Sequence, residues 1–405
     1  MPSRSPVKIV EIPCLDNAVY TFSQPFQFPT HEPSPKFLPL SKPSSTLSLD
    51  NYSTVTSCSS IHSSSSDHSE HEEFAIDVAK VPSRFVFTDI NPTPAKPNRK
   101  SRFAFISQLK NIFPQKKKAL PLVEALEKRR GPLLKDNYGP FEKVIGTGNG
   151  GNVQLTNSES NGQKYAVKTF RKRFSSESET RYYEWLSNEI FLAASIKHPN
   201  IVDVQDVILE DGEIHQVMPY YPSDLFGIVS SGEISAELAG KYFIQLLRGL
   251  FYLHSRGFGH RDLKLENICV DGSGDAKIID FGCAVVFKTF GYDPKLVEDV
   301  CGSDPYIAPE IFTGRPYDVR KSDIWSAAIV YISMILKRHP WDVALSNDKS
   351  YKLYLEHRKV DRFFNKIPSG AATILKKMLE PNPSLRATME DILADEWIQS
   401  LDAKH

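Results

Sequence analysis

Two polar clusters between His260 and Gly282, one on either side of a short apolar hairpin, constrain the fold and the function of this chain more than any other feature. The sequence there reads HRDLKLENICVDGSGDAKIIDFG. Two apolar runs within 268–279 are separated by DGSGD, which predicts two short strands joined by a turn. A hairpin of this size would bring Asp262, Asn267 and Asp280 to the same end of a sheet.

Transfer of a phosphoryl group to a hydroxyl needs a cluster of this kind. One carboxylate must lie near the incoming hydroxyl, and a second carboxylate with an amide must hold magnesium against the nucleotide phosphates. The sequence HRDLKLEN followed by DFG resembles the catalytic and metal-binding loops of the eukaryotic protein kinases. Either motif alone would be weak evidence, but both in this order and at this spacing form a specific signal.

The resemblance implies a role for each polar residue of these loops. Asp262 is expected to accept or orient the proton of the substrate hydroxyl, and Lys264 to neutralise charge on the transferring phosphoryl group. Asn267 and Asp280 are expected to bind Mg²⁺. The implied cofactors are therefore ATP and Mg²⁺, and the lysine of DLK is the pattern of serine/threonine kinases rather than tyrosine kinases.

A glycine-rich segment precedes this region at 141–153 and reads FEKVIGTGNGGNV. Its GxGxxG spacing alone would fit a dinucleotide-binding turn or no site at all. Strand-like sequence follows it at 152–156 and 164–170, which favours a hairpin over nucleotide phosphates, because a dinucleotide-binding turn should open a helix. The residues expected to contact the nucleotide here are Ile145, Gly146, Thr147, Gly148, Asn149, Gly150, Gly151, Asn152 and Val153.

The strand after the glycine-rich segment carries the sequence YAVK, which resembles the VAIK strand of kinases. By that match Lys168 is directed at the α and β phosphates, and Ala166 belongs to the nucleotide-binding residues. Further along, Met218 matches the position that limits the depth of the adenine pocket.

A helix after Ser187 is expected to carry the acidic partner of Lys168. Glu189 is the preferred candidate and Glu184 the competing one. The sequence assigns no clear role to the Ser-, Glu- and Arg-rich segment 171–181 that comes before this helix.

The rest of the chain predicts a mainly helical domain. Apolar residues recur at helical spacing over 236–257, and 322–336 is apolar nearly all round, which predicts a buried central helix. The resemblance also implies two structural roles. Asp323 is expected to hold the catalytic loop by hydrogen bonds, and Arg386 to pair with Glu310 of the sequence APE.

The segment from Asp280 to Glu310 has few hydroxyl groups on which regulation by phosphorylation would act. Ser303 matches the family hydroxyl that contacts the catalytic aspartate and lysine, so it is a poor phosphorylation site. Asp299 lies where many relatives carry a phosphorylated threonine. We therefore expect Asp299 to provide a permanent anion for Arg261, and the alternative is an exposed acidic loop residue without such a role.

Three shorter segments narrow the resemblance. GSDPYIAPE at 302–310, KRHPWDVA at 337–344 and SYKL at 350–353 look like the fungal nitrogen-permease-reactivator and halotolerance kinases. Those kinases have long serine-rich N-terminal tails and regulate plasma-membrane transporters. The resemblance thus implies a role in regulating transporters or permeases in a fungus.

Residues 1–131 are not expected to form a packed domain. Thirteen of the 29 residues over 41–69 are serine and prolines recur before them, so the segment cannot bury enough apolar surface to offset the entropy of ordering it. We interpret it as a disordered regulatory tail. Within it, 96–118 is basic with apolar residues at helical spacing, and it is a candidate for contact with a membrane surface or a partner, or else a basic linker.

The expected architecture behind this tail is an α+β bilobal protein-kinase fold over 138–398. A small β-rich N-lobe would cover 138–218, and a larger helical C-lobe 222–398. Two alternatives remain, namely a catalytically silent scaffold with the kinase fold and a small-molecule kinase. The intact catalytic motifs argue against the first, and the full segment ending in APE argues against the second.

The composition limits the classes of partner that we expect and indicates the cellular compartment. The formal net charge is zero, so nothing in the whole-chain charge favours nucleic acid, and the expected partners are proteins with Ser or Thr acceptors. The five cysteines lack metal-ligand spacing, which suggests a reducing compartment rather than a disulfide framework. Without an apolar run of membrane-spanning length or a convincing signal peptide, we expect a cytoplasmic monomer.

Overall fold

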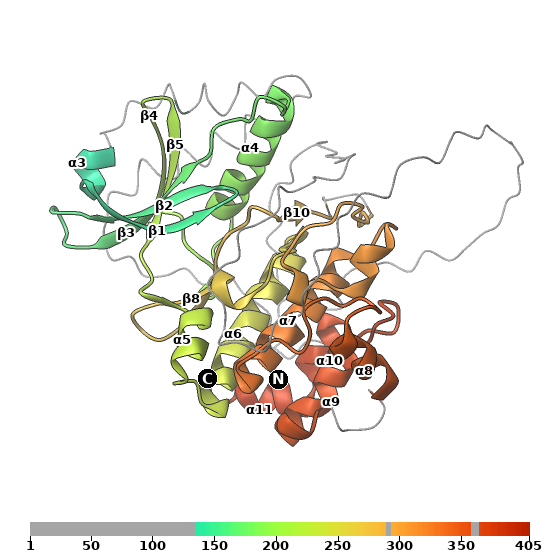
Figure 1. Ribbon diagram of the computed structural model, residues 1–405. Helices are drawn as coiled ribbons and strands as arrows, with labels where there is room; N and C mark the ends of the chain where they lie inside the picture. Colours follow the sequence, from blue (N-terminus) through green and yellow to red (C-terminus); the bar gives the residue numbers. More distant parts are fainter. Residues whose placement is uncertain (1–125, 127–133, 289–292, 358–363) are drawn as a thin grey trace, which may run out of the picture. The chain divides into compact units, whose positions relative to one another are not determined.

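The computed structural model describes residue 126 and residues 134–288, 293–357 and 364–405 (Figure 1). The tail predicted over 1–131 and its basic segment 96–118 lie outside these ranges, except for residue 126. The described part has a smaller lobe built on strands and a larger lobe built on helices, which confirms the predicted α+β bilobal fold.

The smaller lobe is built on one antiparallel sheet with strands β1 (Phe141–Gly148), β2 (Gly151–Asn157), β3 (Lys164–Phe170), β4 (Asp206–Glu210) and β5 (Glu213–Pro219). Their order in the sheet is β1-β2-β3-β5-β4. Val167 and Val217 pair across β3 and β5 and are both fully buried. Together with Tyr165 they pack against Leu134 of the short helix α3 (Leu134–Tyr138), so an apolar core supports the central strands.

Helix α4 (Glu179–Ser195) belongs to this lobe and begins about two turns earlier than the sequence predicted. Ser178 caps it, because its side chain accepts a hydrogen bond from the Arg181 N–H at 3.2 Å. The apolar period used for the prediction starts at Ile190, although the helix is already buried at Tyr182 and Leu186. The first two turns mix charged and aromatic residues without a clear apolar period, so the prediction missed them.

The larger lobe consists of helices α5 (Leu225–Ser231), α6 (Ala236–Ser255), α7 (Val319–Leu336), α8 (Lys349–His357), α9 (Ser369–Met378), α10 (Met389–Ala394) and α11 (Glu396–Asp402) (Figure 1). The prediction of a central buried helix is confirmed by α7, which is buried over most of its length. It begins one turn before the predicted start because Asp318 caps it through the Arg320 N–H at 2.9 Å.

Short strands and 3-10 helices link the α-helices of the larger lobe. The strands are β6 (Ser223–Asp224), β7 (Phe258–Gly259), β8 (Ile268–Val270), β9 (Ala276–Ile278) and β10 (Val285–Val286). The 3-10 helices, labelled η, are η3 (Leu265–Asn267), η4 (Asp304–Tyr306), η5 (Pro309–Thr313) and η6 (Phe364–Lys366). The predicted hairpin is present as β8 and β9, with Ile268 paired to Ile278. Strand β10 returns to pair with β7, just before the catalytic loop. Among the helices of the described ranges, none is both long and apolar enough to cross a membrane.

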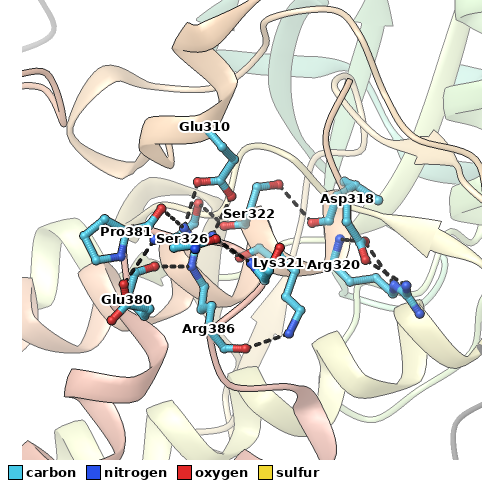
Figure 2. Close-up of polar contacts among 12 residues, drawn as sticks. Glu310, Asp318, Arg320, Lys321, Ser322, Ser326, Glu380, Pro381 and Arg386 are labelled. Carbon is cyan, nitrogen blue, oxygen red and sulfur yellow. Dashed lines mark hydrogen bonds and ion pairs between the residues drawn. The ribbon is translucent and has the colours of Figure 1, made fainter. Parts of the chain in front are cut away.

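A buried ion pair connects the end of the segment 280–310 to the helical lobe (Figure 2). The Arg386 side chain is fully buried, and its two terminal nitrogens donate to the two carboxylate oxygens of Glu310 at 2.5 and 2.7 Å. Further donors of Arg386 reach the carbonyl oxygens of Glu380 and Lys321. The geometry is that of the pair implied by the sequence resemblance.

Candidate active site

Asp262 lies at the centre of a group of polar side chains that the sequence had predicted to work together. Its Oδ1 accepts a hydrogen bond from Ser303 Oγ at 2.9 Å, and its Oδ2 accepts one from Asn267 Nδ2 at 3.0 Å. Lys264 Nζ lies 2.9 Å from Asp262 Oδ2 and also donates to Ser303 Oγ. The carboxylate is thus fixed in one orientation, with its side chain 13% exposed.

Asp323 of α7 holds the backbone of the loop that carries Asp262. The Asp323 carboxylate is fully buried and accepts hydrogen bonds from the N–H groups of His260 and Arg261, at 2.9 and 2.8 Å. Arg261 has φ 68°, in the left-handed region that costs free energy for a residue with a side chain. The two hydrogen bonds to Asp323 stabilise that conformation and so place Asp262.

Lys168, Glu189 and Asp280 form a second charged group, which joins the two lobes. Lys168 Nζ makes a buried ion pair with Glu189 Oε1 on α4 and donates to Asp280 Oδ1 at 3.0 Å. Glu189 was the preferred candidate for this partner, and the side chain of the competing Glu184 lies outside the described part. Asp280 itself has φ 60°, and its Oδ1 also accepts from the Gly282 N–H.

The charges of this group determine its protonation. Burial alone would lower the pKa of Lys168, but the carboxylates of Glu189 and Asp280 outweigh it and raise that pKa above its usual value. Desolvation by the surrounding protein alone would raise the pKa of Asp280. The Lys168 ammonium outweighs this effect and lowers the pKa to about 2. Asp280 therefore stays ionised at neutral pH, and its side chain is still 44% exposed.

The glycine-rich segment forms the hairpin of β1 and β2, with Gly148 opposite Gly151 at its tip. Strand β2 follows it directly, so the dinucleotide-binding alternative is excluded. Gly151 has φ 139°, and a Cβ atom there would lie 2.0 Å from the Thr169 carbonyl oxygen, so only glycine fits at this point of the hairpin. The predicted residues 145–153 all lie on this hairpin.

The other residues predicted to contact the nucleotide lie on neighbouring strands of the same sheet. Val153 on β2 is opposite Lys168 on β3, and Ala166 on β3 is opposite Met218 on β5. Ile145 is 38% exposed although it is apolar. An exposed apolar side chain at this position is available to contact an apolar group of a ligand.

Asn267 and Asp280 fit a magnesium ion by the chemistry of their donor atoms. Asn267 Nδ2 donates to the Asp262 carbonyl and carboxylate, so its amide oxygen remains for a cation. A carboxylate and an amide oxygen are ligands that Mg²⁺ accepts, usually with substrate phosphates and water. In the described residues no three His, Cys, Asp or Glu side chains form a metal cluster of their own.

Asp299 and Arg261 are in direct contact. Arg261 Nη1 lies 2.5 Å from Asp299 Oδ1, and its Nε donates to the Cys283 carbonyl at 2.6 Å. Burial alone would lower the pKa of Arg261, but the Asp299 carboxylate outweighs it and raises that pKa further. Tyr317 also donates to the Asp299 carbonyl at 3.0 Å. Asp299 is thus positioned by several contacts rather than being an exposed loop residue.

The cysteine spacing suggested a reducing compartment rather than a disulfide framework, and the structure nevertheless contains one cysteine pair that is bonded. Cys283 and Cys301 are joined by a disulfide, although they are separated by 18 positions in the sequence. The prediction looked for closely spaced cysteines, whereas the fold brings these two together by turning the chain back. Strand β10 pairs with β7, and Val297 bridges to Tyr317, so both cysteines come beside Arg261.

A cluster around Arg171 was also missed by the sequence analysis. Arg171 makes a bidentate ion pair with Glu177, with Nη1 2.8 Å from Oε2 and Nη2 3.0 Å from Oε1. Its guanidinium carbon lies 4.6 Å from the centre of the Trp185 ring. Trp185 Nε1 donates to the Gly282 carbonyl at 3.3 Å. The segment 171–181 thus supports a tryptophan that connects α4 to the DFG sequence. An arginine six residues before a glutamate was the only available signal, and it is common in surface loops.

We predict that Trp185→Phe lowers kcat for phosphate transfer by about two- to tenfold, the size of one ordinary hydrogen bond. Phenylalanine keeps a ring under Arg171 but removes the donor to Gly282, so the position of Asp280 becomes less well defined. Steady-state kinetics measure the change, and KM for the peptide substrate is expected to stay constant. An unchanged kcat, or a loss that follows a lower unfolding temperature, would contradict this positioning role.

The fold and the two charged groups define a protein of the kinase class, and sequence comparison supports the same conclusion. A family model described as the protein kinase domain matches residues 140–398, which is more than half of the 405 residues. The chain belongs to the protein kinase family.

Individual relatives confirm the predicted resemblance to a fungal group. The chain is 35% identical to the nitrogen permease reactivator protein of Saccharomyces cerevisiae, over 64% of this chain and 39% of that protein. It is 42% identical to the serine/threonine-protein kinase oca2 of Schizosaccharomyces pombe, over 54% and 34% of the two chains. For the serine/threonine-protein kinase HAL4/SAT4 of Saccharomyces cerevisiae the identity is 35%, over 67% and 47%. The matches span between about a third and a half of these relatives.

Proposed function

We propose that this protein is a kinase that transfers the γ-phosphoryl group of ATP to Ser or Thr residues of proteins in the presence of Mg²⁺. The observation that carries the proposal is the joint placement of Asp262, Lys168 and Asp280. Asp262 contacts Lys264 and Ser303, as the proposal requires on the side of the acceptor hydroxyl, and Lys168 contacts Asp280, as it requires on the side of the nucleotide. The names of the fungal relatives support serine and threonine as acceptors.

Each side chain has a defined task in this proposal. Asp262 accepts or orients the proton of the acceptor hydroxyl, and Lys264 offsets negative charge on the phosphoryl group in transfer. Lys168 binds the α and β phosphates, and Glu189 keeps its ammonium in place. Asp280 and the amide oxygen of Asn267 would hold Mg²⁺, whose contribution when bound is to neutralise phosphate charge and align the reacting groups.

The test is phosphate transfer from Mg-ATP to a peptide library containing Ser, Thr or Tyr acceptors, with purified full-length protein. Transfer to Ser and Thr but not to Tyr is the expected result. The Asp262→Asn protein, purified in the same way, controls for contaminating kinases. Absence of transfer by a folded, nucleotide-binding protein would instead favour the alternative of a catalytically silent scaffold.

A role in regulating plasma-membrane transporters in a fungus is the finer part of the proposal. It is supported by the printed name of one relative, the nitrogen permease reactivator protein. We further propose a cytoplasmic monomer whose basic segment 96–118 contacts a membrane surface or a partner. Transporter phosphorylation that is the same in cells with the wild type and with Asp262→Asn would contradict the first idea. Failure of a 96–118 peptide to bind anionic vesicles would contradict its membrane form.

We also propose that Asp299 makes activity independent of phosphorylation in the segment 280–310, by acting as a permanent anion for Arg261. In the presence of a reductant, Asp299→Ala is expected to lower activity about tenfold or more, the size of one hydrogen bond between charged groups. Glu298→Ala is the matched control, because it removes the neighbouring exposed acid, and it is expected to have no effect. Equal activity of Asp299→Ala and wild type in reductant would remove the idea.

A further inference from the structure

The two cysteines of the segment 280–310 lie close in sequence to residues of the two charged groups, Asp280 and Ser303. Cys283 directly follows the DFG sequence that contains Asp280, and Cys301 lies two residues before Ser303. The disulfide between them therefore joins the start of the segment, next to the DFG sequence, to the part that contacts the Asp262 carboxylate through Ser303.

Arg261 connects the same two places without a covalent bond. Its Nε donates to the Cys283 carbonyl at 2.6 Å, and its Nη1 donates to Asp299 Oδ1 at 2.5 Å, two residues before Cys301. Both contacts are shielded, since the Arg261 side chain is 7% exposed and that of Asp299 22%. Two tethers therefore hold the same part of the segment 280–310, namely the Arg261–Asp299 ion pair and the Cys283–Cys301 disulfide.

The two cysteine residues differ in their exposure to solvent. Cys283 is half-buried and Cys301 is only 8% exposed, so a peroxide reaches Cys283 first. Burial raises the pKa of Cys269, the remaining cysteine of the described residues, to about 12, so that this thiol is not expected to react.

The chemistry balances with hydrogen peroxide as oxidant and a dithiol as reductant. The Cys283 thiol takes one oxygen from the peroxide, which leaves as water, and becomes a sulfenic acid. The Cys301 thiol then attacks that sulfur, the S–S bond forms and a second water leaves. Two electrons have passed from the two thiols to the peroxide. A dithiol returns them, restores both thiols and becomes a disulfide itself.

We propose that Cys283 and Cys301 form a reversible thiol-oxidation site. When the disulfide is present, it holds the segment 280–310 in the conformation for catalysis even without the Asp299–Arg261 ion pair. This inference rests on the proposed kinase function. The ion pair is then needed in the reduced protein and dispensable in the oxidised one. Such a use agrees with the redox-sensing or catalytic role that disulfides usually have in reducing compartments.

The bond itself is tested without any activity measurement. The full-length chain, with Cys14, Cys58 and Cys269 replaced by serine, is treated with hydrogen peroxide or with dithiothreitol, alkylated, digested and analysed by mass spectrometry. Peroxide is expected to link the two remaining cysteines in most molecules, and dithiothreitol to release them. Alkylation of both thiols after peroxide treatment overturns the proposal.

Peptide phosphorylation then tests the tether. Asp299→Ala is introduced into that chain and into a version that also carries Cys283→Ser and Cys301→Ser. With the cysteine pair present, Asp299→Ala is expected to lose about tenfold or more in dithiothreitol and less than about threefold after peroxide. With the pair replaced, the loss is expected to be the same in both states. A loss that is equal in both states with the pair present overturns the proposal.

The two measurements separate failure of the tether from failure of the kinase function. A cross-link that forms while the Asp299→Ala loss persists rejects the tether and leaves phosphate transfer intact. If none of the chains transfers phosphate, the proposed function fails, and the same four chains are compared by unfolding temperature. Oxidation is then expected to offset the destabilisation caused by Asp299→Ala, and no offset overturns the proposal.

Discussion

Replacing Asp262 by asparagine is expected to lower kcat for peptide phosphorylation by about 10²- to 10⁴-fold, the usual contribution of a positioned acid or base. Asparagine has nearly the shape of aspartate, so it can still contact Ser303, Asn267 and Lys264. It lacks the negative charge that accepts or orients the proton of the acceptor hydroxyl. The loss should therefore come from the chemical step rather than from a displaced loop.

The split between kcat and KM makes this prediction specific. Lys168 and Asp280, which are assigned to the nucleotide, are not hydrogen-bonded to Asp262 in the structure. KM for ATP is therefore expected to remain close to the wild-type value in Asp262→Asn, and the unfolding temperature likewise. Steady-state kinetics with varied ATP and peptide give both constants.

Asp211→Asn is a matched control for the chemical change from carboxylate to amide. Asp211 lies exposed in the turn between β4 and β5, with φ 50°, a conformation that asparagine tolerates well. This variant is expected to have wild-type kinetics. If Asp262→Asn keeps more than about a tenth of wild-type kcat, a loss far smaller than general-base removal causes, Asp262 does not have the assigned role.

The parts of the site that were predicted from sequence are those encoded by short, local patterns. The β8–β9 hairpin follows from two apolar runs and a DGSGD turn, and it places Asn267 and Asp280 on its two sides. Lys168 was recognisable because its strand has apolar neighbours and follows a glycine-rich segment. The residues that determine the hairpin are close together in sequence, so periodicity and turn chemistry predict it, whereas the roles of Lys168, Asn267 and Asp280 came from the resemblance to kinase motifs.

The parts that were missed depend on contacts between distant segments. The Cys283–Cys301 bond forms because β10 pairs with β7, and nothing in the spacing of 18 residues indicates it. Trp185 reaches the Gly282 carbonyl across 97 positions. Asp299 is an intermediate case, since a family resemblance proposed its partner Arg261, while its physical contact needed the folded chain.

Replacing Arg386 by methionine is expected to destabilise the domain by about 3–5 kcal/mol, because it leaves the Glu310 carboxylate buried without its partner. Methionine is similar in length and fits beside the Trp325 ring, over which the guanidinium now lies at 4.9 Å. For a domain of this size the loss corresponds to an unfolding temperature lower by roughly 6–20 °C. Thermal unfolding followed by circular dichroism measures it.

Two further variants show whether the cost comes from the uncompensated charge. Arg320→Met removes an arginine that pairs with Asp318 at 2.7 Å near the start of α7, where the side chains are 22% and 25% exposed (Figure 2). A pair that is this exposed is worth at most about 1 kcal/mol, so little change is expected. The double variant Arg386→Met with Glu310→Met removes both buried charges and should recover at least half of the lost stability, since apolar replacements of a buried pair are often neutral. If Arg386→Met costs no more than Arg320→Met, the Glu310–Arg386 pair does not hold the end of the segment 280–310 to the helical lobe.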